Sequence, residues 1–582
     1  MKEAWKTRIA GALNTLIREA GIVGTIDPAQ VIAENPPKPE LGDLGFPMFG
    51  FAKVLRKSPL QIAQAVAAQL EAHPDTGSFA AVGPYVNVRF DRATVAAAIL
   101  AQVQSVPFGR PGTLKGSRIM VEFSSPNTNK PLHLGHLRND VLGESISRIL
   151  LACGAEVRKV CIINDRGIHI CKSMLAYQEH GQGKTPESEG IKSDHFVGDW
   201  YVKFHQMNQT DPTAEERAQE LLRKWEASDL ETVELWKQMN QWTVEGMKKT
   251  YERTGVSFDQ YYFESQTYLK GKDEILKGLD QGLFYKEADG AVWVDLNAEK
   301  LDKKVLLRKD GTSLYITQDI GTAIFRHHDW PFDRLVYVVG SEQQYHFKVL
   351  FTILKKLGYD WAKNLYHLSY GMVNLPEGKM KSREGTVVDA DDLLDSLKDL
   401  AVQEIREKDR EAAVGDSLGT AEKIALGALH YYLLSVSPGK DMLFNPQESL
   451  SFNGNTGPYL QYMGARISSM LRKDAQLRTQ GEAPTGTIKP ELLSGDAEWE
   501  LIKTLGTYPE AIGEAAAWMD PSILATYLYE LSKAFSRFYH DCPILNADSP
   551  DLAATRLSLS RGVLMVLQDA LSLICIPFLE IM

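Results

Sequence analysis

Short apolar runs alternate with amphipathic stretches through the middle of the chain. Residues 118–123 (RIMVEF), 156–164 (EVRKVCIIN) and 334–340 (RLVYVVG) are rich in Val, Ile and Leu and predict buried strands. Residues 132–154 and 167–180 carry apolar positions at helical spacing and predict helices between these strands. Strands that alternate with helices in this way predict a parallel sheet covered by helices.

The pattern changes on both sides of this region. Residues 1–115 combine an amphipathic helix, a loop rich in Pro and Gly, and the strand-like stretch YVNVRF. Within the predicted parallel-sheet domain, residues 116–400, a charged helical insertion is expected near 185–265, with its tryptophans as packing anchors. Residues 401–582 read as helices throughout. We therefore predict a multidomain α/β protein: an N-terminal α+β domain, a Rossmann-type parallel-sheet domain and a C-terminal all-α bundle.

Composition narrows the class of protein. The 582 residues are 44% hydrophobic and 24% charged, as in soluble globular proteins, and no apolar run is long enough to span a membrane. The amphipathic N-terminus does not resemble a signal or transit peptide, and the five scattered cysteines suggest neither a disulfide framework nor a zinc site. We expect a cytoplasmic protein. The net charge of −11 argues against non-specific polyanion binding but leaves room for a local basic surface.

The stretch KPLHLGHLRND, residues 130–140, follows the first predicted strand of the sheet. Its histidines are three residues apart, which places them on one face of a helix start. A metal site would need further ligands at suitable spacing, and none is evident. Ligands of parallel sheets bind where strands end, and helix N-termini offer free N–H groups to phosphates. A glycine between the histidines would let a nucleotide approach the backbone.

A second candidate for phosphate binding is the basic loop GKMKSREGTVV, residues 378–388. A charge run of this kind is usually a solvated loop. Combined with H-x-G-H after a first strand, it suggests instead a mobile loop that closes on a triphosphate.

These two stretches resemble the paired signatures of class I aminoacyl-tRNA synthetases. Further stretches resemble arginyl-tRNA synthetases specifically: VEFSSPNTNKPLHLGHLRND, DGTSLYITQDIGTAIFR, GSEQQYHF, FNGNTGPYLQYMGARI, GDLGFPMFGFAKVLRKSP and VGPYVNVRF. The resemblance covers essentially the whole chain. It implies that arginine is activated with ATP to arginyl-adenylate and then transferred to the 3′ end of tRNA(Arg), with release of pyrophosphate and AMP.

The resemblance also implies roles for individual residues. Catalytic contacts fall on Lys130, His133, His136, Lys379 and Lys381. ATP binding falls on His133, Gly135, His136, Lys379, Met380, Lys381, Ser382 and Arg383. Ser382 stands where the K-M-S-K-S pattern has its second lysine, and Lys130 is expected to substitute for that lysine, with Lys381 as the other candidate. Arginine binding falls on Glu122, Ser125, Asn127, Tyr315, Asp319 and Gln343, and tRNA binding on Tyr459, Gln461, Tyr462 and Arg466.

Some of these residues have a second interpretation. Glu122 is a lone carboxylate in an apolar strand, so it needs a partner, which is either the substrate guanidinium or a core arginine. Tyr315 and Asp319 are four residues apart, on one side of a helical turn, where an aspartate at a helix start beside a packed tyrosine is the alternative. The aromatic positions near Tyr459 are suited to unpaired RNA bases, although many such side chains belong to the core.

The expected partners are tRNA(Arg), L-arginine and ATP, with Mg²⁺ as the companion of ATP and with no tightly bound protein metal. We expect a monomer, as is usual in the family, without a membrane partner. Two competing functions remain: another enzyme on the same nucleotide fold, such as a cytidylyltransferase or a different class I synthetase, and an inactive relative that only binds RNA. The long C-terminal bundle argues against a small nucleotidyltransferase. The Tyr315/Asp319 pair and the absence of zinc-spaced cysteines argue against a cysteine- or methionine-specific synthetase. The intact Lys130, His133, His136 and Asp319 argue against the inactive relative.

Overall fold

The computed structural model describes residues 2–70, 77–103, 108–268, 270–374, 388–407, 410–480 and 486–582. They form two compact units, each built from several segments of the chain. The first unit comprises Met1–Gly109, Ser469–Pro509 and Glu530–Val566. The second comprises Arg110–Ser468, Glu510–Tyr529 and Leu567–Met582. Among the described residues, no helix is both long enough and apolar enough to cross a membrane.

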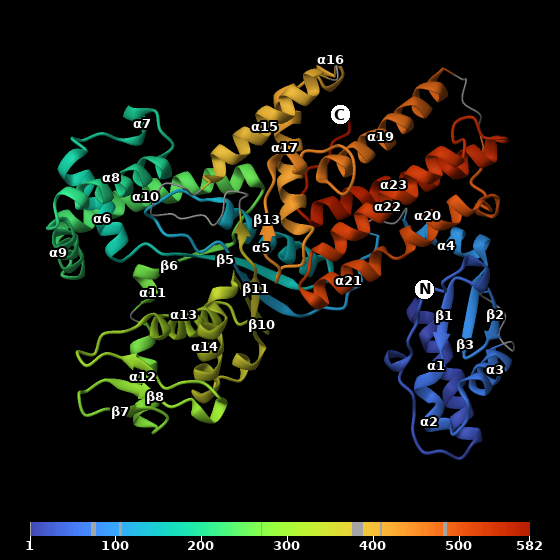
Figure 1. Ribbon diagram of the computed structural model, residues 1–582, viewed down its shortest axis with the longest axis horizontal. Helices are drawn as coiled ribbons and strands as arrows, with labels where there is room; N and C mark the ends of the chain where they lie inside the picture. Colours follow the sequence, from blue (N-terminus) through green and yellow to red (C-terminus); the bar gives the residue numbers. More distant parts are fainter. Residues whose placement is uncertain are drawn as a thin grey trace. The chain divides into compact units, whose positions relative to one another are not determined.

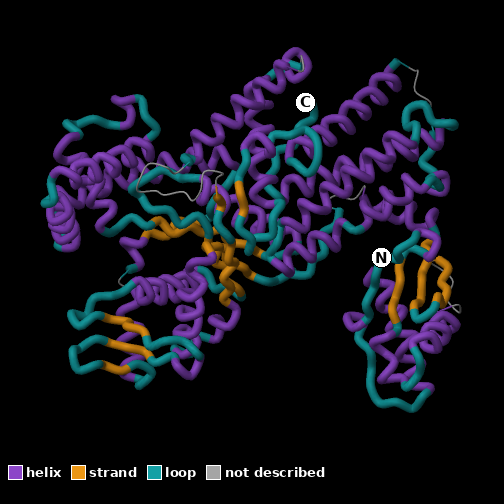
Figure 2. The backbone as a smooth tube through the Cα atoms, in the orientation of Figure 1, coloured by secondary structure: helices purple, strands orange, loops and turns teal. Residues whose placement is uncertain are grey.

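A five-stranded parallel sheet lies in the second unit (Figure 2). Its strands, in spatial order, are β11 (Leu365–Tyr370), β10 (Arg334–Gly340), β4 (Arg118–Glu122), β5 (Glu156–Ile163) and β6 (Gln260–Phe263). Each strand runs parallel to its neighbours. The three strands predicted from the sequence and the parallel sheet are therefore confirmed.

The strand order places a binding crevice beside β4. From β4 the chain adds β5 and β6 on one side, and it later returns to add β10 and β11 on the other side. The connections after β4 and β10 therefore leave the sheet in opposite directions, and ligands of such sheets bind at the carboxyl ends of the strands at this point. The H-x-G-H stretch follows β4 directly.

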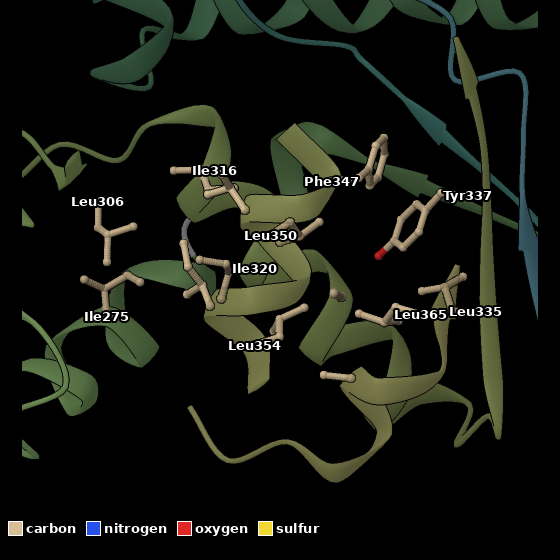
Figure 3. Close-up of a cluster of buried hydrophobic side chains, with 14 of the residues drawn as sticks. Ile275, Leu306, Ile316, Ile320, Leu335, Tyr337, Phe347, Leu350, Leu354 and Leu365 are labelled. Atoms are coloured by element: carbon tan, nitrogen blue, oxygen red, sulfur yellow. The ribbon is translucent and has the colours of Figure 1, made fainter. Parts of the chain in front are cut away.

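The sheet packs against a core that includes two helices downstream of the site. These helices are α13 (Tyr315–Asp329) and α14 (Gln344–Lys356). Figure 3 shows how apolar side chains from strands and helices meet in this core: Leu335, Tyr337, Leu365, Ile316, Ile320, Phe347, Leu350 and Leu354. A small antiparallel sheet and α12 (Lys270–Asp280) extend this core through Leu306 and Ile275. The strands of this sheet are β7 (Tyr285–Lys286), β8 (Val292–Val294) and β9 (Lys304–Leu307).

The helical insertion has a core of its own. Its helices are α7 (Pro186–Glu189), α8 (Ser193–Thr210), α9 (Ala214–Glu226) and α10 (Leu230–Thr254), and they lie beside α6 (Ile168–His180) (Figure 1). Trp200, Trp236 and Trp242 pack into this core, as predicted. The helices end at Thr254, and the following residues form strand β6 of the main sheet, so the helical part is shorter than the stretch 185–265 expected from the sequence.

Helices dominate the C-terminal part of the chain, as predicted. They are α15 (Ala390–Glu407), α16 (Glu411–Val414), α17 (Ser417–Leu434), α18 (Pro446–Ser449), α19 (Gly457–Thr479), α20 (Asp496–Gly506), α21 (Tyr508–Trp518), α22 (Ser522–Asp541) and α23 (Pro550–Leu573). A short parallel pair, β12 (Val373–Asn374) and β13 (Met442–Leu443), connects the segment after β11 to these helices.

The first unit contains the N-terminal α+β fold. Its antiparallel sheet has the order β1 (Leu44–Pro47), β3 (Tyr85–Phe90), β2 (Gly77–Val82), and its N-terminal helices are α1 (Lys2–Glu19), α2 (Ala52–Leu55), α3 (Pro59–Leu70) and α4 (Arg92–Val103). Trp5 of α1 packs edge-on against Phe79, with 5.8 Å between ring centroids. In the same unit, the Trp499 indole donates a hydrogen bond to Asp43, so part of the C-terminal sequence completes this fold.

Candidate active site

The two histidines of H-x-G-H are fixed at the start of α5 (Leu134–Ala152). His133 caps the helix in an extended conformation, and its Nδ1 atom accepts the Gly135 N–H at 3.1 Å. The His136 Nδ1 atom accepts the His133 N–H at 3.2 Å, and the two ring centroids are 3.9 Å apart. Because both Nδ1 atoms accept, each neutral ring carries its proton on Nε2 and presents one N–H donor.

Burial keeps these rings neutral. It lowers the pKa of His133 to about 4, with the nearby Lys130 ammonium as a second cause. The pKa of His136 is also lowered, mainly by burial and further by the nearby His133 ring and Lys130 ammonium. Burial likewise lowers the pKa of Lys130. The motif therefore combines two neutral N–H donors with one half-buried cation, which suits an anionic ligand better than a metal cation.

The expectation of free backbone N–H groups at this helix start is not met. The Leu134 N–H donates to Val388 O at 3.1 Å, the Gly135 N–H is taken by His133 Nδ1, and the His136 N–H donates to His133 O at 2.7 Å. The helix also begins at Leu134 and not at Leu132, because residues 132–134 pair with residues 388–390. Any phosphate bound at this helix start would therefore be contacted by side chains and not by these backbone N–H groups.

Two polar residues on α5, which the sequence did not single out, fix the helix to its surroundings. The buried Arg138 guanidinium donates to the carbonyls of Gly371, Met372, Pro438 and Lys440 at 2.6 to 3.3 Å. Asn139 accepts the Ser124 N–H at 2.5 Å and donates to Val338 O at 2.8 Å. Asn139 thus ties α5 to β10 and to the residue that follows β4, and Arg138 ties it to the residues after β11 and before β13. The only sign of this role in the sequence is that the polar residues Arg138 and Asn139 closely follow the H-x-G-H motif.

The chain turns sharply between β4 and α5. Ser124 and Ser125 both have left-handed backbone conformations, with φ of 70° and 52°. Such conformations are strained for residues with side chains and are found where the surrounding structure enforces them, often at functional sites. The bond from Ser124 to Asn139 and the pairing of Asn127 with Asn164 hold this turn. The turn brings Asn127 to the carboxyl edge of the sheet.

A cavity of about 830 Å³ opens at this edge. Three of the residues predicted to bind arginine line it: Asn127, Tyr315 and Asp319. Its charged lining comprises Arg166, Glu226, Glu264, Lys272, Arg308, Asp310 and Asp319. Both Tyr315 and Asp319 belong to the first turns of α13, and Tyr315 is 78% exposed. The alternative of a packed tyrosine is thereby excluded.

Glu264 is the cavity residue that the sequence did not reveal. Burial raises its pKa to about 7; the Arg166 guanidinium opposes this shift, and the nearby carboxylates of Asp165 and Asp319 add to it. Arg166 itself is paired with Glu226 at 3.1 Å. Glu264 follows β6 directly, and the sequence placed this segment in the helical insertion, so its position at a strand end was missed.

Glu122 is paired with a core arginine, which was one of the two partners that the sequence allowed. Arg326 of α13 donates to the Glu122 carboxylate, and both side chains are buried. Ser125 Oγ lies 3.4 Å from the other carboxylate oxygen. Glu122 is thus engaged with a core arginine, and neither Glu122 nor Ser125 is among the described residues that line the cavity. Gln343 lies immediately after β10, exposed at the same sheet edge.

The basic loop is not part of this geometry, because Lys379, Met380, Lys381, Ser382 and Arg383 lie outside the described residues.

Within the described chain, the His, Cys and carboxylate side chains close enough to share a metal ion are Asp194, His195 and Asp391. This group does not include His133 or His136. The five cysteines are buried free thiols.

The residues predicted to contact tRNA lie on α19. Gln461 is fully buried, and its Nε2 atom donates to Lys423 O and Pro577 O at 2.8 Å. This corrects the assignment of Gln461, whose amide is committed to the protein interior. Tyr462 is exposed, and Tyr459 is half-buried with its ring 6.1 Å from Tyr529. Trp518, at the end of α21, is 74% exposed and was not predicted from the sequence.

The parallel sheet with H-x-G-H after its first strand, followed by a helical C-terminal part, defines a class I aminoacyl-tRNA synthetase. Three family models match the chain: tRNA synthetases class I (R), catalytic domain, over residues 97–445; DALR anticodon binding domain over 460–582; and arginyl tRNA synthetase N terminal domain over 3–90. The chain belongs to the arginyl-tRNA synthetase family.

Individual relatives agree with this assignment. The chain is 60% identical to an arginine–tRNA ligase of Treponema denticola, with both chains covered completely, and 56% identical to that of Treponema pallidum, with 99% of each covered. Among solved structures, it is similar to the arginyl-tRNA synthetase of Thermus thermophilus, with a TM-score of 0.83, 27% identity, and coverage of 99% of this chain and 100% of the other.

Proposed function

We propose that the arginine–tRNA ligase reaction of this chain begins with binding of the substrate guanidinium between Asp319 and Glu264. Both carboxylates line one cavity, and the Asp319 carboxylate adds to the rise that burial causes in the pKa of Glu264. A planar guanidinium supplies several N–H donors and a permanent charge, so it can pair with two carboxylates at once. The presence of these two acids in one cavity is the observation that carries the proposal.

The remaining cavity residues suit the other parts of arginine. Tyr315 presents an exposed ring at the cavity wall, and Asn127 presents an amide at the turn after β4. We assign Asn127 and Ser125 to the α-amino and carboxylate end of the substrate, and Tyr315 and Gln343 to its side chain, although Ser125 and Gln343 are not among the described residues that line the cavity. Glu122 would reach the substrate only if its pairing with Arg326 were exchanged, so we assign it the second role of orienting α13.

ATP is the second substrate. We propose that His133 and His136 donate through Nε2 to its phosphates, that Gly135 lies beneath the adenosine, and that Lys130 balances developing phosphate charge. Neutral imidazoles suit this work because they donate hydrogen bonds without needing a proton from solvent. The loop residues Lys379, Met380, Lys381, Ser382 and Arg383 complete the phosphate contacts in this proposal. The arginine carboxylate then attacks the α-phosphate and pyrophosphate leaves, which requires positioning and charge stabilisation but no protein nucleophile.

We propose that Mg²⁺ accompanies ATP as a phosphate-bound ion, as is common for nucleotide substrates. The carboxylates of Asp194 and Asp391 do not suit it, because Lys192 Nζ already lies 3.0 Å and 2.6 Å from them. The ion would supply charge neutralisation to the phosphates, and Lys130 would supplement it.

For tRNA(Arg), we propose that the anticodon loop contacts Tyr459, Tyr462 and Arg466 of α19, together with Trp518. Exposed aromatic rings stack on unpaired bases, and arginine pairs with phosphates. We retain residues 1–115 as a tRNA-contacting domain, 116–400 as the catalytic domain and 401–582 as the anticodon-binding domain. A cytoplasmic monomer remains part of this proposal.

Pyrophosphate exchange with arginine, measured with and without tRNA, tests the proposal. We expect exchange with arginine and none with citrulline, which lacks the guanidinium charge. Exchange that prefers another amino acid would support a different class I enzyme. RNA binding without any exchange would support the inactive relative.

A further inference from the structure

Residues 388–390 pair with the two residues that flank His133. The Leu134 N–H donates to Val388 O at 3.1 Å, and the Ala390 N–H donates to Leu132 O at 3.0 Å. His133 and Asp389 are thereby antiparallel bridge partners. The His133 ring itself accepts the Gly135 N–H within α5, while these two bonds hold the backbone on both sides of His133. The segment 388–391 therefore contributes to the position of His133.

A group of charged residues from the helical insertion fixes this segment. Lys192 Nζ, just before α8, lies 2.6 Å from Asp391 Oδ2 and 2.6 Å from Thr250 Oγ1. The same ammonium lies 3.0 Å from Asp194, whose side chain is fully buried. His195 lies 3.4 Å from Asp389 and 3.5 Å from Asp391. One lysine thus joins α8, α10 and the start of α15.

Helix α8 also contacts the other side of the motif. A side-chain carbon at Gly198 would lie 2.7 Å from the ring of Pro131 and 3.6 Å from Lys130 Cα, so the helix packs directly on this loop. Gly246 of α10 gives similar room to Asp194, since a carbon there would lie 2.3 Å from its carboxylate. The insertion therefore contacts the chain both before His133 and at its bridge partner.

Cations lie against the carboxylates that hold this segment. Asp194 is paired with Lys192, and Asp391 is paired with Lys192 and with Arg253, whose Nη1 atom lies 3.5 Å from it. Arg253 also bonds Glu422 of α17 at 2.8 Å. Although burial opposes it, hydrogen bonds to His195 and Lys192 lower the pKa of Asp391, so this carboxylate stays ionised. Each of these two carboxylates therefore has a cation partner, and the group acts on His133 through its geometry.

We propose that Lys192 is a positioning residue for catalysis: by holding Asp391 against the insertion, it fixes the backbone pairing that orients His133 toward ATP. This inference rests on the proposed ATP-binding role of His133. A displacement of about 1 Å at a reacting group can reduce the rate on the order of a hundredfold. Loss of Lys192 should therefore lower kcat for arginine activation while the KM for arginine changes little, because the arginine cavity is built from other elements.

The test compares Lys192→Met with Lys184→Met, which removes an exposed ion pair of the same insertion, Lys184–Glu189 at 2.9 Å. We expect Lys192→Met to lower kcat for pyrophosphate exchange on the order of 10- to 100-fold. Amide hydrogen exchange of the peptides containing Leu134 and Ala390 should become faster in the same variant. Lys184→Met should change neither quantity. Unchanged kcat or unchanged exchange at Leu134 in Lys192→Met would overturn the proposal.

Two further variants guard against simple unfolding, since Lys192→Met leaves the buried Asp194 without its cation. Thr250→Val removes only the hydroxyl that bonds Lys192 and Asp391, and we expect a smaller change in the same direction. In a double-mutant cycle, Asp391→Asn should add little to Lys192→Met, because both act through one contact. Additive effects would overturn the proposal. If His133→Ala retains full activity while Lys192→Met is impaired, the ATP-binding role of His133 is the part that fails.

Discussion

The Nε2 atom of His346 lies 2.6 Å from the Oδ2 atom of Asp319, so one carboxylate oxygen is held by the protein and the other is available to a ligand. His346 is on the first turn of α14, directly after Gln343, and this contact joins α13 to the carboxyl end of β10. A histidine that donates one hydrogen bond orients the carboxylate for an incoming guanidinium.

Asp319→Ala should therefore impair the use of arginine far more than the use of ATP. Loss of the counter-charge for a buried guanidinium corresponds to breaking a buried ion pair, which costs about 3–5 kcal/mol. Steady-state pyrophosphate exchange at saturating tRNA measures both substrates separately. His346→Asn, which keeps a donor at that position, should retain more arginine affinity than His346→Ala. If Asp319→Ala has the KM and kcat of the wild type for arginine, Asp319 does not bind the guanidinium.

The pKa of Glu264 makes arginine binding depend on pH. With this pKa raised to about 7, the carboxyl is largely protonated at pH 6, and a guanidinium binds its ionised form. The KM for arginine should therefore fall as pH rises through about 7, by up to tenfold per pH unit below the pKa. Glu264→Gln should raise this KM and flatten its pH dependence. A KM for arginine that does not vary in the wild type would contradict the assignment, and the KM for ATP serves as the control.

Periodicity predicted the framework of the catalytic part because its strands carry apolar runs. RIMVEF and RLVYVVG are nearly continuous apolar segments and EVRKVCIIN contains a shorter one, VCII, as is typical of strands of a sheet covered on both faces. Strand β6 was missed because Gln260–Phe263, read as QYYF, is a short edge strand that follows a long polar helix. Without it, Glu264 could not be placed at a strand end.

Side-chain partners were harder to predict than strands. The sequence left Glu122 with two possible partners. A carboxylate in an apolar strand needs a cation, but the strand does not identify it, and Arg326 lies 204 residues away in the sequence. Gln461 stands among aromatic residues that suit RNA, yet helix α19 turns its amide toward Lys423 and Pro577. These choices depend on helix rotation, which depends on tertiary packing and is not determined by composition.

Trp518→Ala should weaken the interaction with tRNA without affecting stability. Its ring is 74% exposed, so little packing is lost, whereas stacking of a base on an aromatic ring contributes about 1–3 kcal/mol. We expect a KM for tRNA that is raised roughly 5- to 150-fold, and an unchanged melting temperature. Trp518→Phe should keep most of the affinity. Aminoacylation at limiting tRNA is the measurement, and equal KM values for Trp518→Ala and the wild type would remove Trp518 from the interface.

Asp140 should make the stability of the catalytic core sensitive to pH. This residue is fully buried on α5, and burial raises its pKa to about 8, which Ser124 only partly offsets. The folded state therefore holds the proton more tightly than the unfolded chain. The resulting contribution to the free energy of unfolding is complete below about pH 4 and is lost as pH rises through about 8.

Asp140→Asn cannot ionise and should not show this loss. Its free energy of unfolding relative to the wild type should increase steadily between about pH 5 and 8 in urea titrations. Asp280→Asn, at an exposed position, serves as the control and should track the wild type. A constant difference between Asp140→Asn and the wild type over this range would refute the raised pKa.

Lys130 should supply the positive charge near the phosphates that a lysine at position 382 supplies in the K-M-S-K-S pattern. Its ammonium is half-buried in the turn before His133, and burial lowers its pKa, so its charge is less shielded by water than that of a surface lysine. Lys130→Ala should slow arginyl-adenylate formation by a factor corresponding to about 2.7–4 kcal/mol, as for the loss of one transition-state donor. Folding and tRNA affinity should stay nearly unchanged. Single-turnover formation of the adenylate at saturating tRNA measures this step.

The double variant Lys130→Ala/Ser382→Lys separates this role from a structural one. A lysine at position 382 restores a cation in the basic loop without refilling the turn beside Pro131, so recovery of part of the rate would show that charge is what the turn contributes. Lys130→Met, which keeps the aliphatic bulk, should be as slow as Lys130→Ala for the same reason. If Lys130→Ala forms the adenylate at the wild-type rate, the charge comes from Lys381 or Lys379, and the two neutral imidazoles act without a cation in their own turn.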